Sequence, residues 1–292
     1  MKKVLLVGAA GCLGKNLLNV LSNSGYYVVA SDISKYGIPI MQNVEAISND
    51  ELFRKAEFKA DVLINCAFAR GNDVKELASA LNFNEKLIQH IKKFEINAII
   101  NISSQGIYKS LAPGEFANEE SEIVPNDMYS LSKYAQELLF TSNFEKKVTN
   151  VRMASLSSNA RFMHFFVDNV INGKEIIVSA PYQYVSLLDV RDASCGIMQI
   201  CNLPDEKRKD IYNLGNAQQF SILQIAEITR DIGKEYGYNH TSIRIENRGK
   251  SIAVGMDVTK LKNDTNWEAK ISVYEMIKEL FIEKRSNCCE RV

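Results

Sequence analysis

The hydrophobic and polar positions of this chain follow two alternating periods. Short runs such as Val4–Val7 and Val62–Asn65 are apolar almost throughout, as central strands of a parallel sheet are when both faces are buried. The segments between them are amphipathic: in Lys15–Ser24, apolar residues such as Leu17 and Leu21 gather on one side of a helix. The pattern predicts an α/β fold of the Rossmann type, a doubly wound parallel sheet covered by helices.

The regular alternation extends to about residue 155 and then loosens. We therefore expect a nucleotide-binding core at residues 1–155, to which parts of 184–225 return, and a smaller substrate-binding lobe at residues 156–292. In the core, strands are predicted at Val4–Val7, Tyr27–Ser31, Val62–Asn65, Ala98–Ser103 and Val148–Arg152, and helices at Lys15–Ser24, Asp50–Ala56, Asp73–Phe94 and Tyr129–Thr141. Beyond it, strands are predicted at Ile176–Val178, Val185–Asp189, Ile211–Leu214 and Ser242–Ile245, and helices at Phe162–Asn172, Arg191–Asn202, Ile222–Lys234, Thr259–Thr265 and Ser272–Lys284.

The composition excludes several classes of protein. The 292 residues contain 35 basic and 35 acidic side chains, without a basic stripe that would bind nucleic acid or a membrane surface. Three histidines and six cysteines show no metal-ligand spacing, so no metal site is expected. The first twelve residues resemble a bacterial lipoprotein signal, but their apolar stretch runs straight into a helix pattern at Leu13. We therefore expect a cytoplasmic protein.

A glycine loop connects the first predicted strand to the first helix. Its glycines are Gly8, Gly11 and Gly14, and such a loop lets the backbone approach a pyrophosphate at the helix N-terminus. The whole loop, including Cys12 and Leu13, is therefore a candidate cofactor site. Asp32 ends the second strand, where a carboxylate accepts from the adenine-ribose hydroxyls and repels a 2′-phosphate. NAD is favoured over NADP for this reason.

Three motifs in order resemble the extended short-chain dehydrogenase/reductase family. They are the G-x-x-G-x-x-G loop, the pair Ser103-Ser104 after the fourth core strand, and Tyr129-x-x-x-Lys133. This is the group of NAD-dependent epimerase/dehydratases typified by UDP-glucose 4-epimerase. The resemblance implies that the catalytic residues are Ser104, Tyr129 and Lys133, that Lys133 also holds the nicotinamide ribose, and that Cys66, Ala67 and Asn82 lie beside the cofactor.

The chemistry of the tyrosine–lysine pair agrees with that implication. Residues four apart lie on one face of a helix, so Tyr129 and Lys133 can reach the same cleft. A phenol with a pKa near 10 is a poor base, but a nearby ammonium favours the phenolate. Tyr129 would then take a proton from a sugar hydroxyl while Ser104 donates a hydrogen bond to the same oxygen. The alternative is a packed tyrosine beside a solvated lysine.

The substrate side departs from the family pattern at several positions. The 4,6-dehydratases carry an Asp-Glu pair after the catalytic hydroxyl residue, whereas this chain has Gln105 and Gly106, so dehydration is not expected. Ser155 replaces an asparagine and Val185 replaces one arginine that contacts a diphosphate, while Arg248 matches a second such arginine. The resemblance therefore gives Ser104, Gln105, Ser155 and Arg248 as substrate-binding residues.

Three functions remain open from the sequence. The first is an NAD-dependent epimerase of a nucleotide-linked sugar, acting through a transient keto intermediate. The second is an NAD(P)-dependent reductase or dehydrogenase of a keto-sugar or other carbonyl substrate, and the third is a non-catalytic cofactor-sensing module. The apolar faces of Asp73–Phe94 and Tyr129–Thr141 could form the homodimer interface known in the family, or could pack against the sheet.

Overall fold

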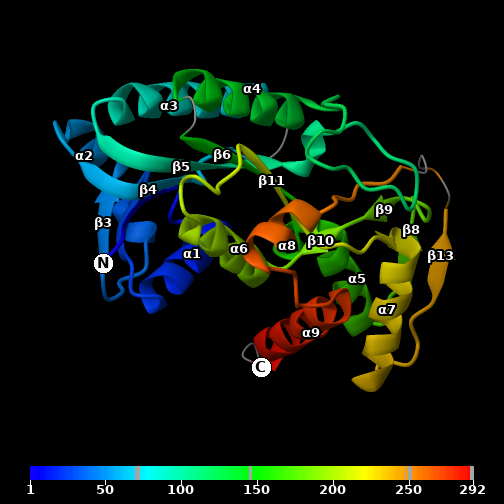
Figure 1. Cartoon of the computed structure of the whole chain (residues 1–292). Coiled ribbons are helices and arrows are strands. Elements are labelled where there is room, and N and C mark those ends of the chain that lie inside the picture. Colours follow the sequence, from blue (N-terminus) through cyan, green and yellow to red (C-terminus); the bar gives the residue numbers. More distant parts are fainter. Residues whose placement is uncertain (70–72, 145–146, 247, 249–251, 290–292) are drawn as a thin grey trace.

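A seven-stranded parallel sheet forms the centre of the molecule in the computed structural model, which describes residues 1–69, 73–144, 147–246, 248 and 252–289. The strand order is β3-β2-β1-β4-β5-β6-β11 (Figure 1). From β1 the chain builds outward on one side and then returns to build outward on the other, which leaves a crevice at the carboxyl ends of β1 and β4. The predicted Rossmann-type fold is confirmed. The strands are β1 (Lys3–Val7), β2 (Tyr27–Asp32), β3 (Val44–Ser48), β4 (Lys59–Asn65), β5 (Glu95–Ser104), β6 (Val148–Met153) and β11 (Ile211–Leu214).

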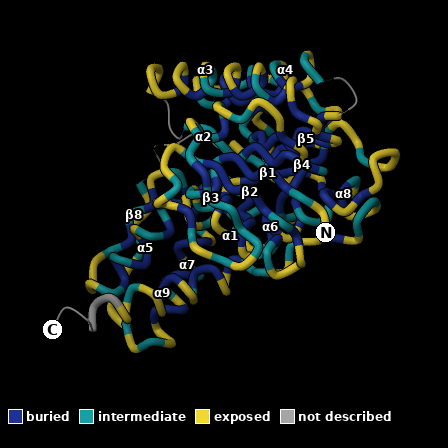
Figure 2. The backbone as a smooth tube through the Cα atoms, turned by 90° about the vertical axis from the view of Figure 1, so that its left-hand side faces the viewer, coloured by how far each residue is buried: buried dark blue, intermediate teal, exposed yellow. Residues whose placement is uncertain are grey.

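Helices cover both faces of this sheet. On one face lie α2 (Asn49–Arg54), α3 (Val74–Ile91) and α4 (Met128–Asn143), and on the other α1 (Cys12–Asn23) and α6 (Val190–Asn202) (Figure 1). Alternate residues of β1 enter different apolar clusters: Leu5 packs with the α3 side and Leu6 with the α1 side. This division explains why the strand is apolar throughout. Figure 2 shows the strands as the buried layer between exposed helix surfaces.

A separate apolar cluster lies in the C-terminal part of the chain. Its residues come mainly from α5 (Arg161–Ile171), α7 (Ile222–Glu235), α9 (Val273–Cys289) and β8 (Ile176–Val178). These helices lie together beside the main sheet (Figure 1). The division of the chain at residue 155 stays a prediction. The remaining elements are β7 (Ser155–Leu156), β9 (Tyr184–Val185), β10 (Leu187–Leu188), β12 (Phe220–Ser221), β13 (Ile243–Ile245) and α8 (Thr259–Thr265).

Two differences between the fold and the predicted elements have a physical cause, and the two-residue strands β7 and β12 were also not expected. β3 was not expected, because it lies at the sheet edge and Ile47 is its only fully buried residue. The strand expected over Val185–Asp189 is two short strands, β9 and β10, which pair with β12 and β7 respectively. Short strands with different partners carry no common period, so the sequence pattern merged them.

The outer surface of α4 exposes two leucines, Leu131 and Leu138. These side chains are consistent with the predicted homodimer, which stays a prediction. None of the helices in the described part of the chain combines the length and apolar character that a membrane crossing requires.

Candidate active site

The glycine loop forms one wall of a large cavity at the carboxyl end of β1. Gly8 has a positive φ of 84°, and a Cβ on it would lie 2.7 Å from the backbone nitrogen of Ala67. A Cβ on Gly14 would lie 2.2 Å from the Gly8 carbonyl oxygen. Only glycine fits both positions, because the first needs left-handed backbone and the second brings helix against strand. The cavity has a volume of about 820 Å³.

Asp32 lines this cavity, and its carboxylate is fixed by two backbone N–H groups. Its Oδ2 accepts a hydrogen bond from the Ala10 N–H at 2.8 Å, and its Oδ1 accepts one from the Ile33 N–H at 2.7 Å. Helix α1 begins beside it without a side-chain cap, so its first N–H groups are available to an anion. Of the predicted cofactor residues, Gly8, Gly11, Asp32, Cys66 and Ala67 line the cavity.

Three other predicted cofactor side chains lie elsewhere. Leu13 is buried in the apolar core, and the Cys12 Sγ lies 3.4 Å from the Ser158 Oγ. Asn82 is exposed and does not line the cavity, whereas Asn84, two residues further along α3, is fully buried. A two-residue shift moves a side chain to another face of a helix, and in this structure Asn84 donates to the carbonyl oxygen of Ala67 behind the cavity wall.

A second cavity, of about 450 Å³, contains the predicted catalytic hydroxyls. Ser104 ends β5, Tyr129 stands in the first turn of α4, and both line this cavity together with Ser155. The Asp127 side chain caps α4 by accepting from the Ser130 N–H at 2.7 Å, which fixes where the helix begins. The structure therefore brings Ser104 and Tyr129 together as the motifs predict.

Lys133 lies one turn beyond Tyr129 and is almost completely buried, with an exposed fraction of 4%. Its Nζ donates to the Ile102 carbonyl oxygen at 2.5 Å and to the Gln136 Oε1 at 2.6 Å. Burial lowers the pKa of Lys133 to about 7, because a buried ammonium loses its hydration. The lysine can therefore gain and lose a proton near neutral pH.

Phe68 connects the first cavity to the Tyr129–Lys133 pair. It lines the cofactor-side cavity, its ring centroid lies 4.3 Å from the Lys133 Nζ, and its ring meets Tyr129 edge-on at 6.1 Å. A cation over an aromatic face is attracted by the ring quadrupole. Lys133 and Tyr129 are thus close to both cavities.

The predicted substrate residues divide into two groups. Gln105 Nε2 donates to the Ser155 Oγ at 3.1 Å, while the Gln105 Oε1 is buried without a partner among the described residues. Arg248, in contrast, is 74% exposed, pairs with Glu246 at 3.3 Å and does not line the second cavity. Its match to the family arginine therefore does not bring it to the site in this structure.

Arg161 is a cavity residue that the sequence reasoning missed. It lines the second cavity at the first position of α5 and forms no ion pair with another described residue. A cation at a helix N-terminus opposes the helix dipole, which favours acidic residues there. This unfavourable charge at the start of a predicted helix was the sequence feature that could have indicated a binding role for Arg161.

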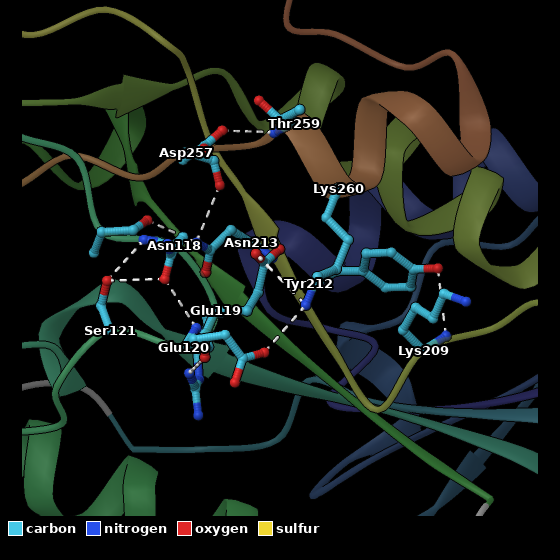
Figure 3. A network of polar contacts seen from close by, with 12 residues as sticks. Asn118, Glu119, Glu120, Ser121, Lys209, Tyr212, Asn213, Asp257, Thr259 and Lys260 are labelled. Atoms are coloured by element: carbon cyan, nitrogen blue, oxygen red, sulfur yellow. Dashed lines mark hydrogen bonds and ion pairs between the residues drawn. The ribbon is translucent and has the colours of Figure 1, made fainter.

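The later sequence landmarks hold the 115–122 loop against β11 (Figure 3). Glu119 Oε1 accepts from the Asn213 N–H at 2.9 Å. Asn213 Nδ2 donates to the carbonyl oxygens of Ala117 and Asp257, at 2.9 and 3.1 Å, and Lys260 lies 3.7 Å from Glu119. The motifs around Tyr212–Gly215 and Asp257–Lys260 therefore join β11 to the 115–122 loop.

The described residues contain no group of three or more potential metal ligands.

Comparisons with known proteins agree with this geometry. A family model described as the NAD dependent epimerase/dehydratase family matches residues 4–215. The chain is 23% identical over 309 aligned residues to a putative UDP-glucose 4-epimerase of Methanocaldococcus jannaschii, a match that covers 97% of this chain and 99% of that protein. It is 29% identical over 155 residues to a dTDP-4-dehydrorhamnose reductase of Aggregatibacter actinomycetemcomitans, covering 51% of this chain and 50% of that reductase.

The fold is also similar to that of a solved epimerase. The UDP-glucuronic acid 4-epimerase of Bacillus cereus, in complex with UDP-glucuronic acid and NAD, matches with a TM-score of 0.79 over 98% of this chain and 99% of that one. The sequence identity is 16%, so this likeness shows the fold alone. Because the family model covers well over half of the chain, this protein belongs to the NAD-dependent epimerase/dehydratase family and is an NAD-dependent enzyme of the extended short-chain dehydrogenase/reductase type.

Proposed function

We propose that this enzyme epimerises a carbinol centre of a nucleotide-linked sugar through a transient keto intermediate. The observation that carries the proposal is that Ser104 and Tyr129 line one cavity, directly beside the cavity of the glycine loop. The two positions after Ser104 hold Gln105 and Gly106, so the acid that expels water in a dehydratase is missing there. Epimerisation needs only groups that move one proton while hydride is exchanged.

The larger cavity fits NAD. Gly8 and Gly11 line the cavity with backbone alone, and the uncapped start of α1 would hold the pyrophosphate through backbone N–H groups. Asp32 would accept from the adenine-ribose hydroxyls, and its charge would repel a 2′-phosphate, so we propose NAD rather than NADP. NAD bound there supplies hydride exchange, which no amino-acid side chain provides.

The chain's own residues would then control one proton and one oxygen. Tyr129 would take the proton from the sugar hydroxyl and return it after the sugar has turned over. Ser104 would donate a hydrogen bond to the same oxygen, which stabilises negative charge on it. The ammonium of Lys133 would favour the phenolate form of Tyr129.

Arg161 supports a phosphate-bearing substrate. It is the charged residue among the described residues that line the substrate cavity, and a guanidinium suits bidentate contact with phosphate oxygens. We propose that Arg161 holds the diphosphate of the nucleotide, the role for which Arg248 was expected.

A reductase of a keto-sugar is the second candidate. The 29% identity over 155 residues to a dTDP-4-dehydrorhamnose reductase favours it, and its chemistry would use the same Ser104, Tyr129 and Lys133. The two candidates differ in whether the cofactor is consumed.

The test is to incubate the purified enzyme with NAD and a panel of UDP-, dTDP-, GDP- and CDP-linked sugars. Proton NMR follows the sugar, and absorbance follows NADH. We expect a second epimer of one sugar to accumulate without net NADH. A parallel reaction supplies NADH and a nucleotide-linked keto-sugar: steady NADH consumption there, without any epimer in the first reaction, would replace the epimerase proposal with the reductase.

A further inference from the structure

A row of asparagine side chains crosses the central sheet beneath α3 and α4. Asn65, Asn101 and Asn150 occupy matched positions on β4, β5 and β6. Asn65 Nδ2 donates to Asn101 Oδ1 at 3.2 Å, and Asn101 Nδ2 donates to Asn150 Oδ1 at 2.9 Å. All three residues are buried. Buried amides are costly unless they are hydrogen-bonded, and here they bond to one another.

The row continues to the active-site lysine through one residue from each helix. Asn84 Oδ1, on α3, accepts from Asn65 Nδ2 at 2.7 Å and from Gln136 Nε2 at 3.0 Å. Gln136, on α4, accepts in turn from Lys133 Nζ at 2.6 Å. Asn84 Nδ2 donates to the carbonyl oxygen of Ala67 at 3.4 Å, and Ala67 lines the cofactor-side cavity. One hydrogen-bond path therefore joins Lys133 to the wall of that cavity.

Gln136 holds the lysine nitrogen without neutralising it. A lysine side chain has four rotatable bonds and loses much conformational freedom when it is fixed. Two acceptors, the Ile102 carbonyl oxygen and the Gln136 Oε1, define where Nζ lies, and the Phe68 ring covers it on the cofactor side. Because the amide of Gln136 is neutral, the charge of Lys133 stays available to Tyr129 and to a ligand.

We propose that Gln136, held by Asn84, is a positioning residue that fixes the Lys133 ammonium for the cofactor ribose. Gln136 acts through Lys133 and does not itself contact substrate or cofactor. The inference rests on the proposed function in one respect, since it takes Lys133 to serve bound NAD.

The test compares the dissociation constants of NAD and ADP by titration calorimetry, because ADP lacks the ribose that Lys133 would hold. Gln136→Met removes the acceptor at similar length, and Gln136→Asn keeps an amide that is too short to reach Nζ. We expect each variant to raise the Kd for NAD about ten-fold, because a displaced Lys133 would no longer make its charge-assisted hydrogen bond to the ribose. The Kd for ADP should change less than about two-fold.

Asn150→Leu is the matched control at the far end of the row. It removes a buried amide but leaves Asn84 bonded to Asn65, so it should lower the unfolding temperature and leave the NAD-to-ADP ratio unchanged. Equal weakening of NAD and ADP in the Gln136 variants overturns the positioning role, and so does unchanged NAD binding. The readout needs no sugar: a wild type that binds NAD but epimerises no nucleotide sugar contradicts the proposed function alone.

Discussion

The Asp32 carboxylate is anchored to the glycine loop by the backbone N–H of Ala10, at 2.8 Å. A carboxylate held in this way cannot turn aside for an incoming phosphate, so we expect it to accept from the ribose hydroxyls and to disfavour NADP. We expect Asp32→Asn to reduce the preference for NAD over NADP at least about ten-fold, a change of about 1.4 kcal/mol. Asp50→Asn, an exposed carboxylate at the start of α2, removes the same charge and should leave the preference unchanged. Fluorescence titration with NAD and with NADP measures the ratio of their dissociation constants in each variant.

Tyr129 is expected to be essential for turnover but not for cofactor binding. Tyr129→Phe removes only the oxygen that we propose to transfer the proton, and should lower kcat by about a thousand-fold while the Kd for NAD stays within about two-fold. Tyr134→Phe, on the same helix and packed against the apolar core, is the matched control and should keep its activity. A Tyr129→Phe enzyme with near-normal kcat would remove Tyr129 from the catalytic role.

The buried lysine makes the stability of the cofactor-free protein depend on pH. Because burial lowers the pKa of Lys133 to about 7 from 10.5, the unfolded chain holds a proton above that pH that the folded chain has lost. Unfolding then takes up a proton, so the free energy of unfolding rises with pH from about pH 7. Cys66 and Cys201 oppose this trend above about pH 9, since burial raises the pKa of each thiol to about 12.

The measurement is urea unfolding between about pH 7 and about pH 8.5, where the lysine acts before the thiols. We expect the wild type to gain about 1–2 kcal/mol across this interval. Lys133→Met should lose that gain. An equal gain in both proteins would mean that Lys133 is not the group responsible.

Comparing Gly8 with Gly25 distinguishes the cost of backbone strain from the effect of a steric clash at the cavity. Gly8 and Gly25 both have positive φ, 84° and 79°, but a Cβ has nothing within 4 Å at Gly25, whereas at Gly8 it meets Ala67. Each change to alanine should cost about 1–2 kcal/mol of stability from the left-handed conformation. Only Gly8→Ala should also weaken NAD binding, measured by calorimetry. Equal NAD affinity in the two variants would contradict the assignment of the larger cavity.

Two arginines divide the substrate prediction. Arg161 lines the second cavity, and Arg248 is mostly exposed beside Glu246. We expect Arg161→Gln to weaken binding of UDP or of the true nucleotide sugar about ten- to a hundred-fold, since a charge-assisted contact with phosphate is lost. Arg248→Gln should change it less than about three-fold. The opposite ranking would restore the expectation drawn from the family motif.

The parts of the fold that the sequence predicted share a strong local signal. Strands buried on both faces, such as β1, appear in the sequence as uninterrupted apolar runs. The four-residue spacing of Tyr129 and Lys133 alone predicts that they share one face of a helix. β3 could not be found in this way, because an edge strand with one fully buried residue lacks such a run.

The parts of the site that were missed depend on relations between distant segments. Arg161 reaches the cavity because α5 begins there, which no period in the sequence encodes. Likewise, Asn84 and Gln136 are 52 positions apart and meet only after α3 and α4 pack side by side. A motif match can name the residue types of a site, but only the structure shows that Asn84, and not Asn82, lies on the buried face of α3.

The asparagine row has a consequence for how the sheet forms. Parallel strands made of valine, isoleucine and leucine tolerate slippage, because one apolar residue can replace another along the strand. In β4, β5 and β6, a slip by one residue would carry three amides away from their partners, at about 1–3 kcal/mol for each one left unpaired in the core. Asn65, Asn101 and Asn150 thus specify the register of β4, β5 and β6 among alternative pairings that bury similar apolar surface.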